Sequence, residues 1–403
     1  MIIRKKRKKK ARSRIDPKIP VIIFALLLAI GAVLFLVLHN GTEETAEFGS
    51  MMFSMKDKSA VIIRDEHTYI ASEHTDTDFL KEEGASVNSG DKLATVYKLG
   101  YSGELMQSLL DAREDVYRAQ MERIGATKDQ KLDEINERLS AVKSRITSCV
   151  MLDSGEDLEK LYRSLDDILK ERMEYLRSKV QETENLRGLY AQVDAKEDLI
   201  SAWTEDVTAE SPGVVSFYFD SYEQALNAEK LNMISADLVT RAIKGKGAAN
   251  WTTDDKTRVC RVVDPDKWYL AFITDGSGLK RLAAGVEYEV SIKGHGTFRG
   301  VGLEPVVSGK EIVNIIEFST DMGSLIDVRT VRTDITAAVT GVRVKSGAVT
   351  FEESQPYIEL VLTNSHHSIR VDVLASEDGY AIVRPHESGE SFSEGARYWN
   401  RKR

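Results

Sequence analysis

Histidine and serine residues at the spacings used by enzymes are scarce in this sequence. His366 and His367 are adjacent, whereas the helix of a zinc peptidase places two histidines four residues apart with a glutamate after the first. His295 stands between two glycines, which indicates a turn. Gly276-Ser277-Gly278 lacks the longer glycine pattern of a nucleophile elbow. These residues therefore predict neither a catalytic site nor a metal site.

Phosphate-binding, acid–base and thiol chemistry have no better support. Gly245-Lys246-Gly247 lacks the spacing and the final Lys-Ser/Thr pair of a phosphate-binding loop. Asp254-Asp255 and Glu352-Glu353 are paired acids of the kind expected in solvated turns. Cys149 and Cys260 lie in unrelated segments, so we expect inert thiols and no disulfide framework. The sequence predicts a protein without enzymatic activity or cofactor that acts through its surfaces.

The charge of the chain is distributed very unevenly. Residues 1–18 are dense in lysine and arginine and contain one acid, Asp16, although the 403-residue chain has a net charge of −9. Such a run can bind nucleic acid. Next to an apolar segment, however, its expected roles are to set membrane topology and to attract anionic lipid. We therefore expect a cytoplasmic basic segment and no nucleic-acid partner.

Residues 19–39 are expected to form a transmembrane helix. Ile19 to Leu38 contains no charged residue, and about 20 helical residues span the ~30 Å of a bilayer core. The alternatives are a cleaved signal peptide, whose apolar region is usually ~7–15 residues long, and a buried core helix. The length of the run favours a retained signal-anchor. Because the basic segment stays cytoplasmic, we expect a single-pass protein of the cytoplasmic membrane with its C-terminal bulk outside.

The next segments predict β-structure that cannot stand alone. Residues 40–58 are polar and suit a linker, and residues 59–72 are rich in β-branched residues and predict a strand that leads into the barrel or a membrane-proximal unit. Residues 73–102 contain EEGASVNSGDKLATVY, with turns at Gly84 and at Gly90-Asp91 before an alternating strand. A hairpin this short needs a partner to bury its apolar face.

Residues 103–204 predict an antiparallel coiled-coil hairpin with a turn at Asp153–Glu156. Its second helix should run unbroken from about residue 157 to Trp203, and the phase skip near Gly125-Ala126-Thr127 should change the supercoiling of the first helix without ending it. Each arm would be about 65–70 Å long. A compact bundle is the alternative, but the length and topology favour a rod. The apolar seam is represented by Leu109, Val116, Leu132, Leu139, Leu158, Leu165 and Leu176.

The remainder of the chain predicts mainly β-structure. Residues 205–250 should supply the missing half of the first β unit and a linker, because Pro212-Gly213 is a turn followed by strongly β-forming residues. Residues 251–330 have the short strands and regular turns of a β-barrel, and residues 331–403 form a last β unit. The expected fold is thus mainly β, with a helical hairpin inserted into a small sandwich.

With these segments in order, the chain resembles the HlyD-type membrane fusion proteins, the periplasmic adaptor subunits of export systems. The resemblance covers nearly all residues after Ile19. TGVRVKSGAV (340–349) resembles the membrane-proximal strand of that family, with Lys345 where proline is usual, and SPGVVSF resembles the second half of a lipoyl-like domain. The lipoyl-like motif of the family matches Glu83, Gly84, Val87, Gly90, Asp91, Pro212 and Gly213.

The resemblance implies a lipoyl-like sandwich, a β-barrel, a membrane-proximal domain and a hairpin whose tip contacts a partner. The tip comprises Leu152, Asp153, Ser154, Gly155 and Glu156. Adaptors that dock onto an outer-membrane duct carry arginine, leucine and serine there; Arg145 and Leu152 keep that spacing, but Glu156 takes the place of serine. A monoderm cell without an outer membrane would account for this change. The hairpin also replaces the turn that bears the lysine of lipoylated domains.

The function implied by the resemblance is a non-enzymatic adaptor of an export or efflux system. Its partners would be an inner-membrane transporter, ABC-type or similar, membrane lipid and further copies of the chain in a homo-oligomer. The alternative is a cell-envelope scaffold or regulator, in which the same helices recruit division or wall-remodelling proteins.

Overall fold

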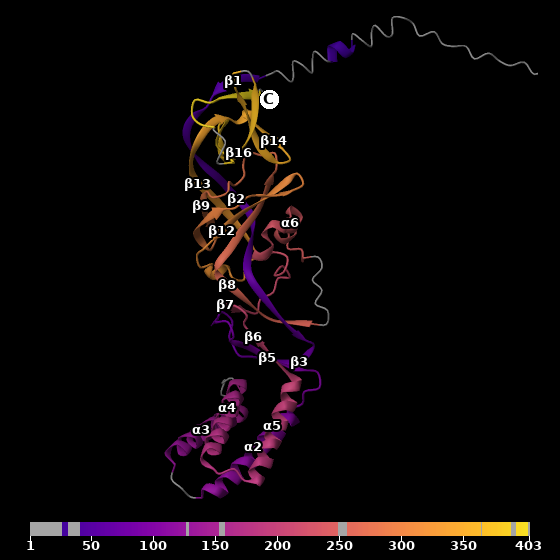
Figure 1. The fold of residues 1–403 in the computed structure, drawn as a ribbon, viewed down its shortest axis with the longest axis vertical. Coiled ribbons are helices and arrows are strands. Elements are labelled where there is room, and N and C mark those ends of the chain that lie inside the picture. The colour runs from indigo at the N-terminus through magenta and orange to yellow at the C-terminus, as the bar shows by residue number, and fades with distance from the viewer. Residues whose placement is uncertain are drawn as a thin grey trace, which may run out of the picture.

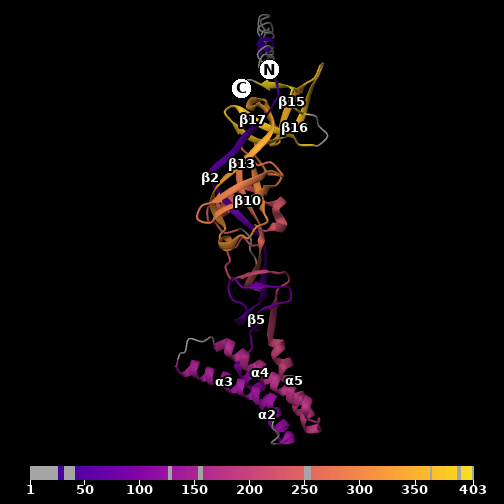
Figure 2. The ribbon, with the colours of Figure 1, turned by 90° about the vertical axis from the view of Figure 1, so that its left-hand side faces the viewer.

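The longest strand, β2 (Glu47–Ser72), runs through three successive β units. It pairs first with β13 (Thr330–Lys345) and then with β8 (Lys256–Asp275), both antiparallel. Its 26 residues extend over about 85 Å at the usual rise of a strand. The computed structural model describes residues 26–30, 41–125, 129–152, 158–248, 256–363, 365–387 and 392–401. Figures 1 and 2 show an elongated molecule with its four long helices at one end.

The central unit is a closed barrel of six antiparallel strands. Strand β2 pairs with both β8 and β13, and the circle continues through β9 (Glu287–Ile292), β10 (Gly296–Gly302) and β12 (Glu311–Phe318). Its interior is aromatic, with Trp268 stacked on Phe318 at 4.0 Å between ring centroids. Strand β11 (Val306–Ser308) pairs antiparallel with the first residues of β12, and the short helix η2 (Gly323–Leu325) follows β12 in the chain.

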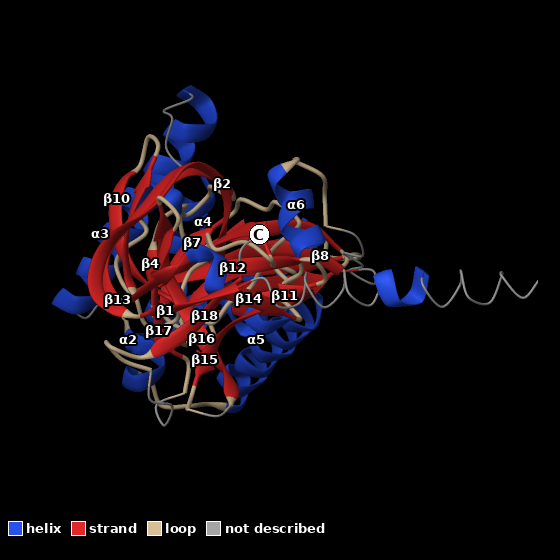
Figure 3. Cartoon of the chain, turned by 90° about the horizontal axis from the view of Figure 1, so that it is seen from above, coloured by secondary structure: helices blue, strands red, loops and turns tan. Residues whose placement is uncertain are grey.

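Both faces of β2 are buried where it crosses the barrel. Ile62 faces the barrel interior, whereas Val61 and Ile63 belong to a second apolar cluster with helix α6 (Ala236–Ile243). Figure 3 shows α6 beside the strands of the barrel. A strand covered on both sides carries a continuous apolar run instead of an alternating one, which explains the sequence AVII. Residues 205–250 were expected to end in a linker, but they include α6 and the short helix η1 (Ala228–Met233).

The unit at the end away from the helices contains the first and last described strands. Strand β1 (Gly41–Thr45) pairs with β18 (Arg397–Arg401), and the rest comprises β14 (Val349–Glu352), β15 (Gln355–Val361), β16 (His366–Glu377), β17 (Tyr380–Pro385) and the short helix η3 (Ser346–Ala348). The expectation that residues 40–58 form a linker is wrong, because β1 and the start of β2 occupy them. Phe53 and Met55 alternate with exposed residues and fill the barrel, a period-2 pattern that the polar composition concealed.

A small sandwich follows the barrel. Strands β3 (His74–Phe79), β5 (Lys92–Lys98) and β6 (Thr204–Thr208) form one sheet, and β4 (Ser86–Val87) and β7 (Gly213–Ser216) pair beside the first part of β8. Val87 and Val215 lie in one buried cluster, although more than a hundred residues separate them in the chain. The helices are inserted between β5 and β6.

The helical segment is not the extended rod expected for residues 103–204. It consists of α2 (Gly103–Ile124), α3 (Gln130–Leu152), α4 (Leu158–Lys179) and α5 (Glu184–Trp203). Gly125 adopts φ +66° and ends α2, so the phase skip marks a helix end. Thr183 caps α5 by accepting a hydrogen bond from the Leu186 backbone at 3.3 Å, which separates it from α4.

The outer part of the hairpin folds back beside the inner part. Helix α2 pairs with α5 and helix α3 pairs with α4, both antiparallel and in one continuous register. The pairs Arg113–Glu197, Gln120–Tyr190 and Arg138–Glu171 show this, because a step forward along one arm is matched by an equal step backward along the other. The two helix breaks therefore lie opposite each other. Figure 1 shows α3 and α4 returning toward the β-sandwich.

Buried polar contacts hold this folded arrangement. The Arg113 guanidinium, 4% exposed, pairs with Asp166 of α4 and with Glu197 of α5 at 2.8 Å. Gln120 is fully buried and donates hydrogen bonds to the Met173 carbonyl at 3.1 Å and to the Tyr190 hydroxyl at 2.8 Å. Because these partners come from different helices, the two side chains hold α2 against both α4 and α5.

The start of α4 also contacts the sandwich. Arg163 Nη1 lies 3.0 Å from Asp78 Oδ1, and Lys160 Nζ lies 2.5 Å from Glu82 Oε1. These exposed and half-exposed ion pairs contribute little stability individually. They nevertheless show that the outer end of the hairpin lies against the unit from which the helices start.

None of the helices in the described segments is long and apolar enough to cross a bilayer. The expected transmembrane helix, residues 19–39, falls outside those segments apart from residues 26–30. The basic segment, residues 1–18, also lies outside them.

Cysteines introduced at positions 82 and 160 should test the folded hairpin. In a Cys149→Ser background, Glu82→Cys with Lys160→Cys should be joined within one chain by a short bifunctional thiol reagent, because the parent side chains touch. Intramolecular cross-linking is read as a mobility shift under denaturing conditions. Glu82→Cys with Glu137→Cys is the matched control, and an extended rod would leave both pairs unjoined.

Candidate functional site

The two glycines in the first half of the lipoyl-like motif make turns that join the separated halves. Gly84 has φ +77° and donates its N–H to the Val215 carbonyl at 2.9 Å, and Gly90 has φ +88° and donates to Ala209 at 2.8 Å. The Val215 N–H returns a bond to Ala85 at 3.0 Å. Positive φ favours glycine, so the motif supplies the backbone shape that brings these donors and acceptors together.

The acids of the motif brace the same turns. Glu83 Oε2 accepts a hydrogen bond of 2.6 Å from the Phe217 backbone N–H in the second half. Asp91 accepts from the Asn88 N–H at 3.1 Å and from Lys81 at 3.3 Å, and the Asn88 bond, followed by the Lys81 bond, lowers the pKa of its carboxyl. These contacts orient backbone and are not arranged around a reacting atom.

The second half of the motif is held by close packing. Val87 pairs with Gly213, where a Cβ atom would lie 2.5 Å from the Val263 carbonyl oxygen. Glycine is therefore required at position 213 on steric grounds. Pro212 precedes it in the exposed turn. All seven residues named for the lipoyl-like motif thus lie at or beside one junction, whose role is to hold the ends of the helical insertion.

The residues named for the helical seam are divided between two clusters. Leu109 and Val116 pack with Leu186, Tyr190 and Val193 between α2 and α5. Leu139 packs between α3 and α4, and Leu165 borders that cluster. Leu132 and Leu176 are buried and Leu158 is half-buried. Because the hairpin is folded, the seam does not form one continuous row.

The expected tip is described only in part. Leu152 ends α3, and Asp153, Ser154, Gly155 and Glu156 lie outside the described residues. Val150 and Met151, immediately before them, are 61% and 76% exposed. These side chains were missed, although their apolar character at the end of a predicted helix was a signal for an exposed apolar surface.

A buried charge network between barrel and sandwich was also missed. Glu66 on β2 accepts from Arg329 at 2.9 Å and from Arg261 on β8, and Arg329 also donates to Asp220 at 2.6 Å. Arg64 contacts Glu66 at 3.6 Å and donates to the Val328 carbonyl at 2.7 Å. Arg64 and Glu66 lie two residues apart directly after the apolar run Ala60–Ile63, so they share one face of β2, and this was the signal that these charges need buried partners.

Burial and charge act in opposite directions on these groups. Burial alone would raise the pKa of Glu66, but the positive charges of Arg329, Arg64 and Arg261 outweigh it and lower the pKa. For Arg64, burial is the largest effect and, with the neighbouring Arg329, lowers its pKa to about 10. Both groups remain charged at neutral pH. The network is a structural joint in which each carboxylate offsets adjacent guanidinium groups.

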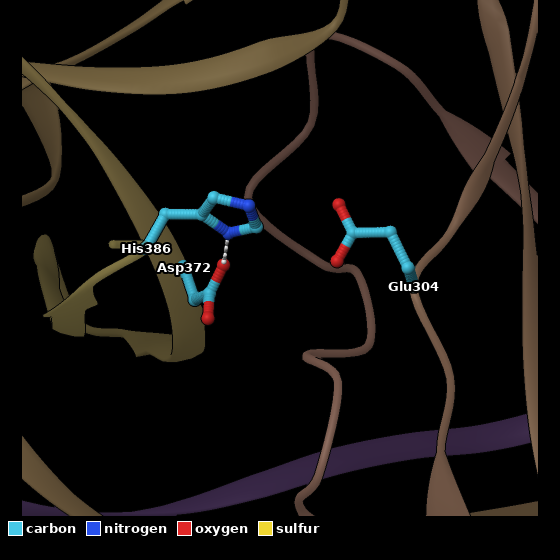
Figure 4. A group of neighbouring side chains, drawn as sticks. All are labelled: Glu304, Asp372 and His386. Atoms are coloured by element: carbon cyan, nitrogen blue, oxygen red, sulfur yellow. Dashed lines mark hydrogen bonds and ion pairs between the residues drawn. The ribbon is translucent and has the colours of Figure 1, made fainter. Parts of the chain in front are cut away.

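Figure 4 shows the one group of metal-type ligands found within the described segments: Glu304, Asp372 and His386. Their ligand atoms lie within 4.8 Å of one another. The Asp372 carboxylate accepts hydrogen bonds from Arg384 at 2.9 Å and from His386 Nδ1 at 2.8 Å. The Glu304 carboxylate accepts one from Arg370 at 2.7 Å. Guanidinium groups already neutralise both carboxylates. We therefore interpret the three residues as a polar contact between the barrel and the end unit, and not as a site for a metal cation. The three residues come from separate segments, and their spacing gave no signal.

Cys149 and Cys260 are not joined by a disulfide. Burial raises the pKa of the Cys260 thiol to about 12, which suppresses the reactive thiolate. Cys149 is half-buried near the end of α3.

Substituting a buried residue of the hairpin by a charge should separate its helices. We expect Leu139→Glu to lower the stability of the helical unit by about 3 kcal/mol or more, because a carboxylate would be buried without a partner. In an export adaptor or an envelope scaffold, this change should also abolish partner recruitment and leave membrane insertion intact. Thermal unfolding followed by helical circular dichroism measures the first effect. Ala141→Glu, exposed on the same helix, is the control, and an unchanged melt with normal partner capture would contradict the seam.

Replacing the buried carboxylate of the charge network should change the acid sensitivity of folding. The pKa of Glu66 is lower in the folded protein than its ordinary 4.5. Its contribution to the free energy of unfolding is therefore complete above pH 4.5 and is lost as the pH falls through the pKa of the folded protein. Glu66→Gln should cost about 3–5 kcal/mol at pH 7 and flatten the decline on acidification. Urea midpoints of the β-sheet signal between pH 7 and pH 3 measure both effects. Glu287→Gln, at an exposed position, should leave the dependence of the urea midpoint on pH unchanged. If the midpoint of Glu66→Gln fell with pH as steeply as that of the wild type, this role of Glu66 would be refuted.

No protein-family model and no curated protein matches this sequence. Solved structures with similar folds include ZneB from Cupriavidus metallidurans, 13% identical over 91% of this chain and 94% of that one, with a TM-score of 0.36. MacA from Actinobacillus actinomycetemcomitans is 13% identical over 88% and 98%, with a TM-score of 0.29. The membrane fusion protein Spr0693 from Streptococcus pneumoniae is 12% identical over 71% and 98%, with a TM-score of 0.28.

These TM-scores lie below 0.5, so the comparisons do not assign this chain to a family. A barrel, a sandwich made from two separated segments, a helical insertion between those segments and a terminal β unit are present. This is the order of units expected from the resemblance of the sequence to the HlyD-type membrane fusion proteins.

Proposed function

We propose that this chain is a membrane-anchored, non-enzymatic adaptor of an export or efflux system. Residues 1–18 would lie in the cytoplasm, residues 19–39 would span the cytoplasmic membrane, and the β units and helices would lie outside. The observation that carries the proposal is the placement of the chain ends. Strands β1 and β18 pair at one end of the molecule and the helices occupy the other (Figure 2). An anchor preceding β1 would therefore hold the helices away from the membrane.

Two separate exposed apolar surfaces support contact with more than one partner. Phe48 and Met52 lie on the same outward face of β2 beside the end unit, and they are 63% and 55% exposed. Val150 and Met151 are exposed at the end of α3. Exposed apolar surface favours contact with other proteins or lipid. We assign the first surface to an inner-membrane transporter, ABC-type or similar, or adjacent lipid, and the second to an extracytoplasmic partner.

Rings of identical chains would suit this arrangement, since one adaptor can then surround a transporter with several equivalent copies. The alternative remains a cell-envelope scaffold that recruits division or wall-remodelling proteins. It predicts a different class of partner at the same surfaces.

A photo-reactive amino acid at each apolar surface should separate these functions. We expect a probe replacing Phe48 to capture transporter subunits in intact cells, because that side chain lies at the end nearest the proposed anchor. The measurement is mass-spectrometric identification of the cross-linked proteins. A probe at Lys310, in a turn of the barrel, is the control. Capture of division or wall-remodelling proteins alone would support the scaffold, and no specific capture at either Phe48 or Met151 would overturn both.

A further inference from the structure

A cleft lies between the sandwich and the folded helices. Residues of β3, β5, α2 and α4 line it, and its volume is about 540 Å³. This volume is within the ~300–1,000 Å³ typical of small-molecule sites. One wall belongs to α4, so the cleft exists in this form because the hairpin folds back.

The charges along the cleft are predominantly negative. Asp76, Asp78, Asp166 and Asp167 line it together with a single cation, Arg163. Arg163 pairs with Asp78 at 3.0 Å, and Asp166 pairs with Arg113 outside the lining. Within the described segments, Asp76 and Asp167 have no ion-pair partner, and both are exposed. The cleft therefore presents two carboxylates without compensating positive charge.

Aromatic and apolar side chains make up much of the remaining lining. The rings of Tyr97 and Tyr101 are 4.6 Å apart between centroids and tilted by 44°, and Tyr162 contributes a third ring from α4. Ring faces attract cations, most strongly where water is partly excluded. The apolar lining comprises Leu80, Met106, Leu110 and Leu165.

We propose that this cleft binds a monovalent organic cation with an aromatic or apolar body. The tyrosine faces and the two uncompensated carboxylates attract the positive charge, whereas the leucine and methionine side chains cover the body. A small metal ion fits less well, because it would need several oxygen atoms converging on one point and would not use the apolar lining. Organic anions are disfavoured by the same carboxylates. The assignment does not depend on a role in export.

Ethidium, an aromatic monovalent cation, is a suitable probe of the full-length protein in detergent micelles. Uncharged phenanthridine has the same ring system and serves as the neutral comparison. Fluorescence titration at low ionic strength, with empty micelles subtracted, should show ethidium binding at least tenfold tighter than phenanthridine. Binding should weaken as salt is added, because the attraction is partly electrostatic.

The double variant Asp76→Asn/Asp167→Asn should weaken ethidium binding about tenfold and change phenanthridine binding less than twofold. Asp194→Asn/Asp198→Asn removes the same charge from exposed positions of α5 and should leave both affinities within twofold of wild type. Tyr162→Leu keeps an apolar side chain but removes a ring, and it should weaken ethidium binding several-fold. Circular dichroism establishes that each variant is folded.

Three results would overturn the assignment. The first is wild-type protein that binds ethidium no more tightly than phenanthridine. The second is an equal loss of affinity for ethidium and phenanthridine in Asp76→Asn/Asp167→Asn, which would indicate that the cleft has changed shape and not merely lost charge. The third is equal weakening of ethidium binding in the cleft and α5 double variants, which would show that overall charge alone attracts the dye.

Discussion

The backbone pairing of β2 is the constraint on which the other units depend. One uninterrupted strand bonds to β13 in the end unit and the barrel, and to β8 in the barrel and the sandwich. The three β units therefore share strands and are not separate bodies joined by flexible linkers. Where barrel becomes sandwich, β2 carries Arg64 and Glu66 into the buried network with Arg261 and Arg329. A slip in register by one residue would turn these charges toward apolar surroundings, so the network also favours one alignment.

The sandwich solves a connectivity problem created by the helical insertion. Its two halves cannot pair until about a hundred intervening residues bring β6 and β7 back beside β4 and β5. The reciprocal bonds between Gly84, Ala85 and Val215 join the halves directly. The folded hairpin then contacts the sandwich again through Arg163 and Lys160, so helices and sandwich support each other. The cleft between them is a product of that double attachment.

Local signals in the sequence accounted for the order of the units better than for their geometry. The turn glycines and β-branched runs predicted a mainly β chain with a barrel, and the heptad-like spacing predicted paired helices. The return of α3 and α4 was not predicted, because Gly125 and Thr183 are individually weak signals and their effect depends on the buried contacts of Arg113 and Gln120. Residues 40–58 were misassigned because polar residues on an exposed strand face resemble those of a linker. The clustering of Glu304, Asp372 and His386 depends on tertiary structure alone.

The length of β2 also has a mechanical consequence. A strand is already close to the greatest length that its backbone can reach, about 3.3–3.6 Å per residue. Force applied between the amino-terminal end and the helices would run along this strand, which has almost no slack to release. The load would act in shear on many ladder hydrogen bonds at once instead of opening them singly. The β units should therefore resist stretching along the axis of β2. Any extension under such a force should occur mainly at the breaks between the helices.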